Sequence, residues 1–284
     1  MINTTKIRIA VGLVTYNNSE SELQFWLKSL TNAVSYAKNF WNDFGLVLYW
    51  IDNGKPQSVF SGLDFAIELE SQGNIGYTAA VNQIITRAFQ DEEITHFQSA
   101  NPDGAFHPYF FEEMLLFANN FPQAIIESAQ FPEEHPKLYD QYTFDTTWAT
   151  GTATLYPRHI VESVGLMDPN FFMYCEDVDF SWRARLQGFS IKHCPGAKYG
   201  HHVVNRQNSD LVKTYFFESG RYLAEKWGGT SFKQWCEQML LDEKLYQDSS
   251  QFKTYEVVPV KGTSKQLKSI ANFDHHFYFS EGRW

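Results

Sequence analysis

Continuous apolar runs alternate with helix-type patterns along the first 130 residues of the chain. Apolar runs bounded by turn residues predict buried strands, and apolar residues spaced three or four apart predict helices. The predicted strands cover residues 7–15, 46–51, 66–69, 95–100 and 124–129, and the predicted helices cover 19–37, 78–89 and 108–119. This alternation indicates βαβ units and an α/β fold with a mostly parallel central sheet flanked by helices.

The pattern changes in the second half of the chain. Residues 148–156 are small and β-prone, 159–164 fit a short helix, and 189–194 fit a strand. Val178, Trp182 and Leu186 recur every four residues and predict a helix that ends at Gly188. A last helix is predicted over residues 211–227. We expect a main domain over residues 1–205 and a C-terminal helical extension over 206–284.

Composition excludes several classes of protein. The 284 residues include 33 Asp and Glu against 23 Lys and Arg, a net charge of −10, which makes general nucleic-acid binding a poor expectation. Three scattered cysteines without a CxxC pair disfavour a cysteine zinc site and suggest reduced thiols in a cytosol. The sequence has neither a signal-peptide pattern nor an apolar window long enough to span a membrane. We therefore expect a soluble cytoplasmic protein, with contact to the inner face of a plasma membrane left open.

Polar or flexible residues follow the predicted strands at 15–17, 52–54, 74–76 and 101–103. Each group alone is explained by a turn or a helix cap. Parallel sheets, however, bind ligands beyond the carboxyl ends of their strands, so four such groups at one edge favour a binding site. The chain lacks GxGxxG after the first strand and lacks GxxxxGK[ST], so dinucleotide and P-loop sites have no support.

Three acids crowd the start of the predicted helix that contains Trp182. Glu176, Asp177 and Asp179 directly follow an apolar aromatic run at 171–174. Interaction with the helix dipole accounts for one acid in a first turn, but not for three. Crowded carboxylates beside apolar rings repel and desolvate one another, which raises their basicity. The sequence therefore favours a catalytic or metal-binding role for at least one of these acids.

Six segments resemble, in order, the inverting GT-A-fold glycosyltransferases of the family 2 type, especially rhamnosyltransferase- and galactofuranosyltransferase-like members. The segments are VGLVTYN (11–17), YWIDNG (49–54), NIGYTAAVNQ (74–83), SANPDGAF (99–106), ATGTATLYPRHIVESVGLMDPNFFMYCEDVDFSWRARLQGFSI (149–191) and PGAKYGHH (195–202). The long run FFMYCEDVDFSWR followed by PGAKYGH is the most specific part. The resemblance implies that residues 1–205 form a GT-A nucleotide-sugar-binding and catalytic domain.

The resemblance also assigns a donor site. Thr15, Tyr16 and Asp52 would hold the base and ribose of a nucleotide sugar, and Asn74, Gly76 and Asn82 would line the sugar-diphosphate channel. The full donor set that it implies is Thr15, Tyr16, Asn17, Asp52, Asn74, Gly76, Asn82, Asn101 and Asp103.

A metal site follows from the same comparison. Asn101-Pro102-Asp103 stands where the family has its DxD motif, so Asp103 would bind a divalent ion. His201 matches a histidine that completes the metal site in related enzymes. Such ions neutralise the charge of a leaving diphosphate and are usually held by only one or two carboxylates of the protein. An imidazole ligand favours Mn²⁺ over Mg²⁺. Asn101 replaces an acid of the motif, which leaves one carboxylate where many relatives have two.

Asp177 of the Glu-Asp pair would be the catalytic base. An acceptor hydroxyl needs a base within hydrogen-bond reach, and attack opposite the diphosphate would invert the sugar. Aromatic rings near this helix are candidates for the wall of an acceptor site, with core packing as the alternative for about half of them. These acceptor-site candidates are Trp148, Phe171, Phe172, Tyr174 and Trp182, together with Glu176.

The predicted function is metal-dependent transfer of a sugar from a dTDP- or UDP-sugar to a hydroxyl of a glycan or lipid-linked glycan in cell-surface polysaccharide synthesis. The alternatives are a nucleotidyltransferase, whose Gly-rich phosphate loop is missing after the first strand, and a non-catalytic nucleotide-sugar or glycan-binding module. Residues 252–270 contain four lysines and one glutamate. This stretch is compatible with a solvated face, with contact to anionic lipid, with a homodimer contact or with a cover over the acceptor groove.

Overall fold

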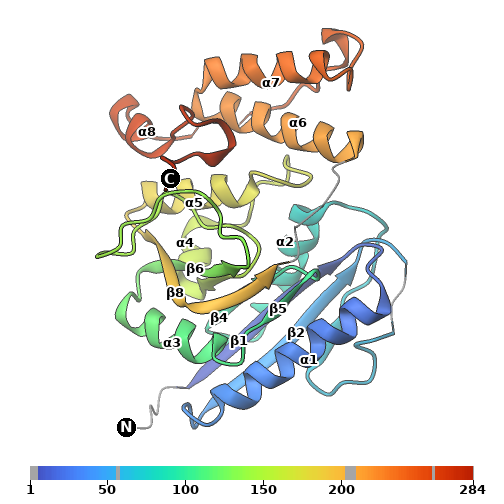
Figure 1. The fold of residues 1–284 in the computed structure, drawn as a ribbon, viewed down its shortest axis with the longest axis vertical. Helices are drawn as coiled ribbons and strands as arrows, with labels where there is room; N and C mark the ends of the chain where they lie inside the picture. Colours follow the sequence, from blue (N-terminus) through green and yellow to red (C-terminus); the bar gives the residue numbers. More distant parts are fainter. Residues whose placement is uncertain (1–5, 56–57, 202–208, 258–259, 284) are drawn as a thin grey trace.

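The structure is a computed structural model that describes residues 6–55, 58–201, 209–257 and 260–283 (Figure 1). The described residues form one eight-stranded sheet with the strand order β3-β2-β1-β4-β7-β6-β8-β5. Its strands are β1 (Ile7–Thr15), β2 (Phe44–Asp52), β3 (Ala66–Glu68), β4 (His96–Ala100), β5 (Gly104–Phe106), β6 (Ala124–Phe131), β7 (Thr154–Pro157) and β8 (Ser190–His201).

The sheet is mixed, with a parallel majority of strand pairs. Strands β3, β2, β1 and β4 run parallel, and so do β6 and β8. Strand β7 is antiparallel to both of its neighbours, and the edge strand β5 is antiparallel to β8. The register of β1 and β2 places Thr15 directly beside Asp52, so the first two polar strand ends meet as expected.

Helices cover both faces of the sheet. The helices of the main domain are α1 (Glu20–Ala37), α2 (Tyr77–Ala88), α3 (Phe110–Asn120), α4 (Arg158–Val164) and α5 (Glu176–Leu186). One core cluster joins the sheet to α1 and α3, and a second joins it to α2, α4 and α5. Helix α1 begins at a capping box in which Ser19 and Glu22 satisfy each other's backbone amides.

The C-terminal residues form a helical layer over α5. Its helices are α6 (Asp210–Trp227), α7 (Thr230–Asp242) and α8 (Ser264–Ile270). Figure 1 shows α6 and α7 stacked above α5 at the top of the molecule. A third core cluster, rich in aromatic rings, fills the space between these elements. The predicted boundary at 205/206 lies outside the described residues.

Most predicted elements agree with the structure to within a few residues, and the α/β fold class is confirmed. The pattern did not predict the short strand β5, the helices α7 and α8, or the short 3-10 helices η1 (Ser249–Gln251) and η2 (His276–Tyr278). Strand β8 also continues past Pro195 to His201, whereas the pattern predicted an end at residue 194. A register shift between Ser128 and Ala129 of the neighbouring strand β6 accommodates that proline.

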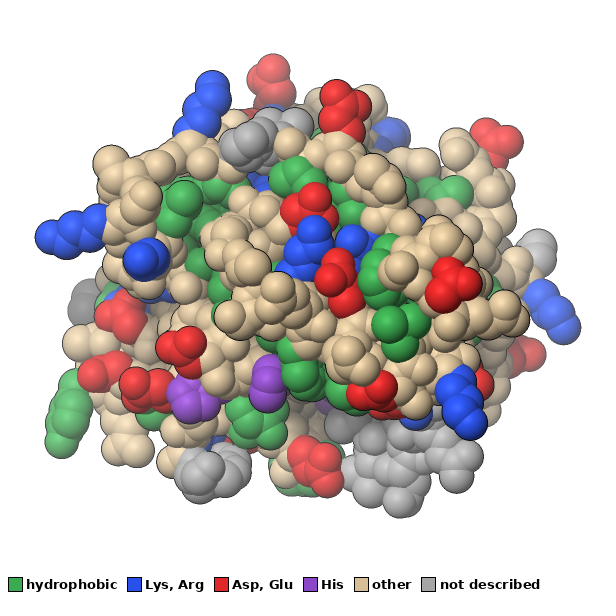
Figure 2. Space-filling model, turned by 90° about the horizontal axis from the view of Figure 1, so that it is seen from above, with side chains coloured by type: hydrophobic (Ala, Val, Ile, Leu, Met, Phe, Trp, Pro, Cys, Tyr) green, Lys and Arg blue, Asp and Glu red, His purple; other side chains and the backbone are tan. Residues whose placement is uncertain are grey.

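The outer face of the extension carries charges of both signs. Figure 2, a view onto this end of the molecule, shows acidic and basic side chains interspersed. Lys233 lies 3.2 Å from Glu225, and the buried Arg221 lies 3.9 Å from Glu225 and 3.7 Å from Glu237. In the described part of the chain, none of the helices has the length and apolar character that crossing a bilayer requires.

Trp182 is the centre of the aromatic cluster between α5 and the extension. Its side chain is fully buried and contacts the rings of Trp227, Phe273 and Phe279 at centroid distances of 5.2–5.6 Å. We expect Trp182→Ala to lower the free energy of unfolding by about 3–5 kcal/mol, because it removes a large buried ring and leaves a cavity. Urea denaturation measures this loss. Tyr142→Ala, at a ring that is 92% exposed, is the control and should change stability by less than about 0.5 kcal/mol. A loss below about 1 kcal/mol for Trp182→Ala would show that the extension does not pack on α5 as described.

Candidate active site

The ends of β1 and β2 form a tight polar corner. Thr15 Oγ1 donates to Asp52 Oδ2 at 2.6 Å, and the amide of Gly54 donates to Asp52 Oδ1 at 2.6 Å. Thr15 and Asp52 are buried, whereas the Tyr16 side chain is 54% exposed. Asn17 adopts a left-handed φ of 54° and lies against Gly54. The four residues predicted at this part of the donor site are therefore neighbours.

The start of α2 touches the aromatic loop that precedes α5. Asn74 Oδ1 accepts from the amide of Gly76, and the amide of Tyr77 donates to the carbonyl of Phe172 at 2.8 Å. Gly76 has φ 85°, and a Cβ there would lie 2.5 Å from the Phe172 carbonyl oxygen. Only glycine fits this close approach. The NIGY segment and the FFMY segment, about 100 residues apart in sequence, thus form one structural unit.

Asn82 has a different environment from the one expected. Its Nδ2 donates to the carbonyl of Met167 at 2.8 Å, and its Oδ1 accepts from the amide of Met167 at 3.0 Å. Both ends of the amide are therefore used to hold the loop before α5. In the structure, Asn82 therefore anchors this loop. The resemblance had implied a position in the sugar-diphosphate channel.

Asn101, Asp103 and His201 come together at the end of β8. Asp103 Oδ1 lies 3.4 Å from His201 Nε2, and Asn101 Nδ2 lies 3.4 Å from the same nitrogen. Strand β5 begins right after Asp103 and pairs with β8, with Gly104 opposite His201. The short strand that the sequence did not reveal is thus the element that brings the predicted metal ligands together.

Gln130 orients the imidazole of His201. Its Nε2 donates to Thr150 Oγ1 at 2.9 Å, which leaves its Oε1 to accept from His201 Nδ1 at 3.1 Å. With the proton on Nδ1, Nε2 carries the lone pair, and this nitrogen lies 3.4 Å from Asp103 Oδ1. A hydrogen-bonded second nitrogen of this kind is typical of metal-binding histidines.

This pair fits a divalent cation. Two ligand atoms about 2.1 Å from one ion and at right angles lie about 3 Å apart, close to the separation of Asp103 Oδ1 and His201 Nε2. In the described ranges, His, Cys, Asp and Glu side chains form no cluster of three or more that could enclose a metal. The described residues thus offer two candidate protein ligands for such an ion, Asp103 and His201.

The three acids at the start of α5 have separate environments. Asp179 is fully buried and pairs with Arg183 and Lys226, each at 2.8 Å, and its Oδ1 also accepts from Trp227 Nε1 at 3.0 Å. These partners tie α5 to α6 and account for Asp179 structurally. Glu176 and Asp177 are left as the candidates for chemistry.

Asp177 is held by backbone amides. Its Oδ2 accepts from the amide of Gly151 at 2.8 Å, and its Oδ1 accepts from the amide of Val178 at 2.8 Å. Burial raises the pKa of Asp177 to about 6, although these amides and the charge of Lys137 act in the opposite direction. Tyr174 and Cys175, just before the helix, both have left-handed φ values, 70° and 63°. Such strained backbone is typical of functional sites.

Glu176 differs from its neighbour in its protonation. It is 5% exposed, and among the described residues no partner reaches its Oε2 atom. Burial and the adjacent charge of Asp177 raise the pKa of Glu176 well above its usual value. Two neighbouring carboxyl groups whose environments separate their pKa values are a common arrangement in acid–base sites. Here the environment makes Asp177 the ionised member of the pair.

The aromatic acceptor-site candidates divide into two groups. Phe171, Trp148 and Trp182 are buried in the aromatic core, and Trp148 donates from Nε1 to the carbonyl of Tyr278 at 2.8 Å. For these three rings the expectation of an acceptor wall is corrected to core packing. Phe172 and Tyr174 remain partly exposed and contact Tyr215 and Phe216 of α6. The extension therefore contributes rings beside the remaining candidates.

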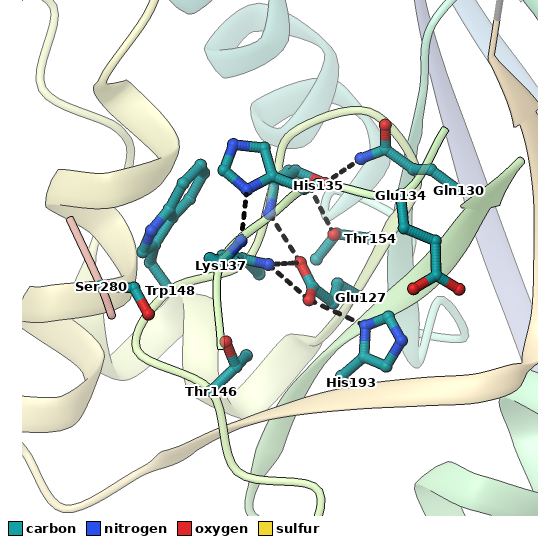
Figure 3. A network of polar contacts seen from close by, with 12 residues as sticks. Glu127, Gln130, Glu134, His135, Lys137, Thr146, Trp148, Thr154, His193 and Ser280 are labelled. Carbon is teal, nitrogen blue, oxygen red and sulfur yellow. Dashed lines mark hydrogen bonds and ion pairs between the residues drawn. The ribbon is translucent and has the colours of Figure 1, made fainter. Parts of the chain in front are cut away.

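The structure contains a buried ion network around Glu127 that the sequence did not predict (Figure 3). Lys137 Nζ donates to both oxygens of Glu127 at 2.5 Å, and His193 Nδ1 lies 3.0 Å from Glu127 Oε1. Glu127 Oε2 also accepts from the amide of Thr150 at 3.1 Å. The sequence contained one signal of this network. Glu127 lies in the middle of a predicted buried strand, and a buried carboxylate requires a partner.

Thr150 and Gly151 connect the two halves of the site. The Thr150 side chain accepts from Gln130, which contacts His201, while the next amide, that of Gly151, donates to Asp177. A continuous chain of contacts therefore runs from the Asp103–His201 pair to Asp177. These contacts link the predicted metal ligands to the predicted base through Gln130, Thr150 and Gly151.

Sequence comparison gives one partial relative. No protein-family model matches the chain. Over 104 residues the chain is 29% identical to rhamnosyltransferase WbbL of Escherichia coli K12, a match that covers 36% of this chain and 38% of that protein. The chain thus matches less than half the length of this curated relative.

Solved glycosyltransferase structures share the fold. A mannosyltransferase from Pyrobaculum calidifontis, in complex with GDP-Man and Mn²⁺, has a TM-score of 0.57 at 13% identity and covers 76% of this chain and 62% of its own. GalNAc-T7 with UDP, GalNAc and Mn²⁺ has a TM-score of 0.56 at 11% identity, covering 80% of this chain and 50% of its own. S. aureus TarS has a TM-score of 0.53 at 15% identity, covering 83% of this chain and 42% of its own. The chain has the GT-A fold of these glycosyltransferases.

Proposed function

We propose that the chain is a metal-dependent inverting glycosyltransferase that moves a sugar from a dTDP- or UDP-sugar to a hydroxyl of a glycan or lipid-linked glycan. The observation that carries this proposal is the connected arrangement of Asp103, His201 and Asp177 on a GT-A fold. The partial match to a rhamnosyltransferase supports sugar transfer, and two structural neighbours are complexes with a nucleotide or nucleotide sugar and Mn²⁺.

Asp177 is the proposed base. Its carboxylate accepts the proton of the attacking acceptor hydroxyl, and a positioned base of this kind contributes about 10²–10⁴-fold to the rate. With a pKa of about 6, the group is mostly ionised at neutral pH yet more basic than an ordinary aspartate. The paired amides of Gly151 and Val178 fix the carboxylate for this role.

Asp103 and His201 are the proposed protein ligands of the metal. A divalent ion held there supplies charge neutralisation for the departing diphosphate. Asn101, at the first position of the DxD-like motif, adds a neutral amide beside His201. The imidazole ligand favours Mn²⁺ over Mg²⁺.

Residues at the ends of β1 and β2 and at the start of α2 are the proposed donor-binding surface. The exposed ring of Tyr16 is available to stack on a nucleobase, while Thr15 and Asp52 shape the corner beneath it. Asn17, Asn74 and Gly76 form the adjoining turns. Phe172 and Tyr174, with Tyr215 and Phe216 of α6, are the proposed acceptor-facing rings.

A thermal-shift screen tests donor binding and separates the nucleotides. Each dTDP- and UDP-sugar is added with and without Mn²⁺, and the melting temperature of the chain is measured. A ligand that binds only the folded state stabilises it by about 2.7 kcal/mol at 100 times its Kd. We expect one nucleotide class to raise the melting temperature, and to do so more strongly with Mn²⁺. No shift for any nucleotide sugar, with or without Mn²⁺, would contradict the proposal.

A further inference from the structure

Lys137 is a buried cation whose position the proposed chemistry does not explain. Its side chain is 3% exposed, and its partner Glu127 is equally buried. Burial raises the pKa of Glu127, but the Lys137 charge and the hydrogen bond from His193 outweigh it and lower that pKa to about 2. Glu127 is therefore ionised at neutral pH. Burial lowers the pKa of Lys137, while the charge of Glu127 and its hydrogen bond act in the opposite direction and favour the ammonium form. Since burying an ion pair is costly, it calls for a reason beyond stability.

The pair is joined to Asp177 through two consecutive backbone amides. Glu127 Oε2 accepts from the amide of Thr150 at 3.1 Å, and Asp177 Oδ2 accepts from the amide of Gly151 at 2.8 Å. The two carboxylates thus accept from consecutive amides of one short segment. A shift of Glu127 would move the Gly151 amide and with it the Asp177 carboxylate.

The segment that carries Lys137 is fixed by the last residues of the extension. Leu138 donates its amide to the carbonyl of Glu281 at 2.8 Å, and the amide of Arg283 donates to the carbonyl of Pro136 at 2.9 Å. Arg283 also lies over the ring of Tyr139, 4.1 Å from its centroid. Lys137 Nζ itself lies 5.0 Å from the centroid of Trp148. Figure 3 shows Lys137 between Trp148 and Glu127.

We propose that the Lys137–Glu127 ion pair is a positioning device for the Asp177 carboxylate, acting through the amides of Thr150 and Gly151 and through the charge of Lys137. The inference rests on the proposed role of Asp177 as base. Neither residue touches the reacting atoms in this scheme, so both are positioning residues.

Other ionisable groups also face Asp177, and the test must separate them from Lys137. Burial dominates the pKa of Asp177, and the Lys137 charge lowers it. The groups that interact with Asp177 from the surrounding elements are Lys137, Glu176, Cys175, Tyr77 on α2 and Tyr156 on β7. Among these groups, Lys137 is the one whose positive charge lowers the pKa of Asp177, so its removal is expected to raise that pKa.

The first test measures the titration of Asp177 without any substrate. The chain is labelled with ¹³Cγ-aspartate, and the Asp177 signal is assigned by its loss in Asp177→Asn. We expect a midpoint near pH 6 in the parent chain and a rise of about one pH unit in Lys137→Met, because an opposite charge nearby favours the carboxylate. Lys137→Arg, which keeps the charge, should restore most of the difference.

Lys192→Met is the matched control. Lys192 is also buried and paired with an acid, Asp145 at 2.8 Å, but its charge is not among the main influences on the pKa of Asp177. Its loss should leave the midpoint of Asp177 within about 0.2 pH units. An unchanged midpoint in Lys137→Met, or an equal rise in both methionine variants, would overturn the proposed charge effect.

A second variant guards against unfolding. Lys137→Met leaves the Glu127 charge buried and unpaired, so the double variant Lys137→Met, Glu127→Gln removes both charges and is expected to fold. In it we expect the Asp177 midpoint to rise in the same direction. The amide of Gly151 should exchange with solvent at least about tenfold faster than in the parent, because this segment loses its ionic anchor. Unchanged exchange at Gly151 would contradict the positioning role.

These readouts need no sugar donor, so failure of this inference is distinguishable from failure of the proposed glycosyl transfer. If the chain proves active, the acid limb of its pH–rate profile should shift to higher pH in Lys137→Met, by the same amount as the Asp177 midpoint. A purely structural role for Lys137 would lower the melting temperature without moving either midpoint.

Discussion

Asp177→Asn is expected to reduce sugar transfer by about 10²–10⁴-fold while leaving nucleotide-sugar binding unchanged, because it removes a proton acceptor but keeps the shape of the side chain. Steady-state rates with saturating donor measure the loss, and the thermal shift caused by the donor measures binding. Glu176→Gln is the matched neighbour. Burial and the Asp177 charge favour the protonated form of Glu176. Glu176→Gln should therefore lower the rate of sugar transfer by at most about tenfold. Near-normal transfer by Asp177→Asn would remove the base from the mechanism.

The same substitution should also affect stability in a pH-dependent way. The folded-state pKa of Asp177, about 6, lies above the usual value of 3.8. The wild-type carboxyl therefore contributes full stability below about pH 4 and loses it as the pH rises through 6. The melting temperature of Asp177→Asn relative to wild type should accordingly increase between pH 4 and pH 8. A difference that is independent of pH would mean that this carboxyl does not titrate with a raised pKa.

Asp103→Ala is expected to abolish the additional thermal stabilisation that Mn²⁺ gives to the donor complex and to reduce transfer by at least about 100-fold. A bound metal supplies several kcal/mol of charge stabilisation, and each 1.4 kcal/mol corresponds to about tenfold in rate. Transfer with increasing Mn²⁺, and its loss with EDTA, measure the dependence. If Asp103→Ala transferred sugar at the parent rate, with no loss on addition of EDTA, the proposed site would be ruled out.

Asn101→Asp is the informative counterpart of Asp103→Ala. It restores a second carboxylate beside His201, where the amide now lies 3.4 Å from Nε2. We expect the Mn²⁺ concentration for half-maximal transfer to fall, because oxygen anions bind such ions more tightly than amides do. An increase in that concentration would indicate that Asn101 does not adjoin the metal.

The sequence predicted the parts of this fold that local patterns determine. Strand β1 is a run of nine mainly apolar residues, and its burial follows from that pattern. Helix α1 was predicted over residues 19–37 from its helical spacing, and the structure has it over Glu20–Ala37. Strand β5 has three residues and no periodicity, and α7 begins after Gly229 without a side-chain cap. Such elements owe their stability to tertiary contacts, so local patterns could not reveal them.

The candidate site was predictable to the same degree. The resemblance placed Asp103 and His201 together although 98 positions separate them, and the structure puts Asp103 Oδ1 3.4 Å from His201 Nε2. It did not reveal that Asn82 anchors Met167, whereas the burial of Trp182 agrees with the apolar spacing of its helix and with the core packing that was left open for about half of the rings. Lys137 stands in an irregular, polar segment, and only the folded chain shows that it is buried against Glu127.

The most direct test of the account is the release of nucleoside diphosphate and the transfer of sugar, followed by mass spectrometry, with the donor that best stabilises the chain and a panel of glycan and lipid-linked acceptors. We predict transfer with inversion at the anomeric carbon in the presence of Mn²⁺, loss of transfer with EDTA, and a parallel loss in Asp177→Asn. Donor that binds but is never transferred, in wild type and variant alike, would identify a binding module and contradict the account.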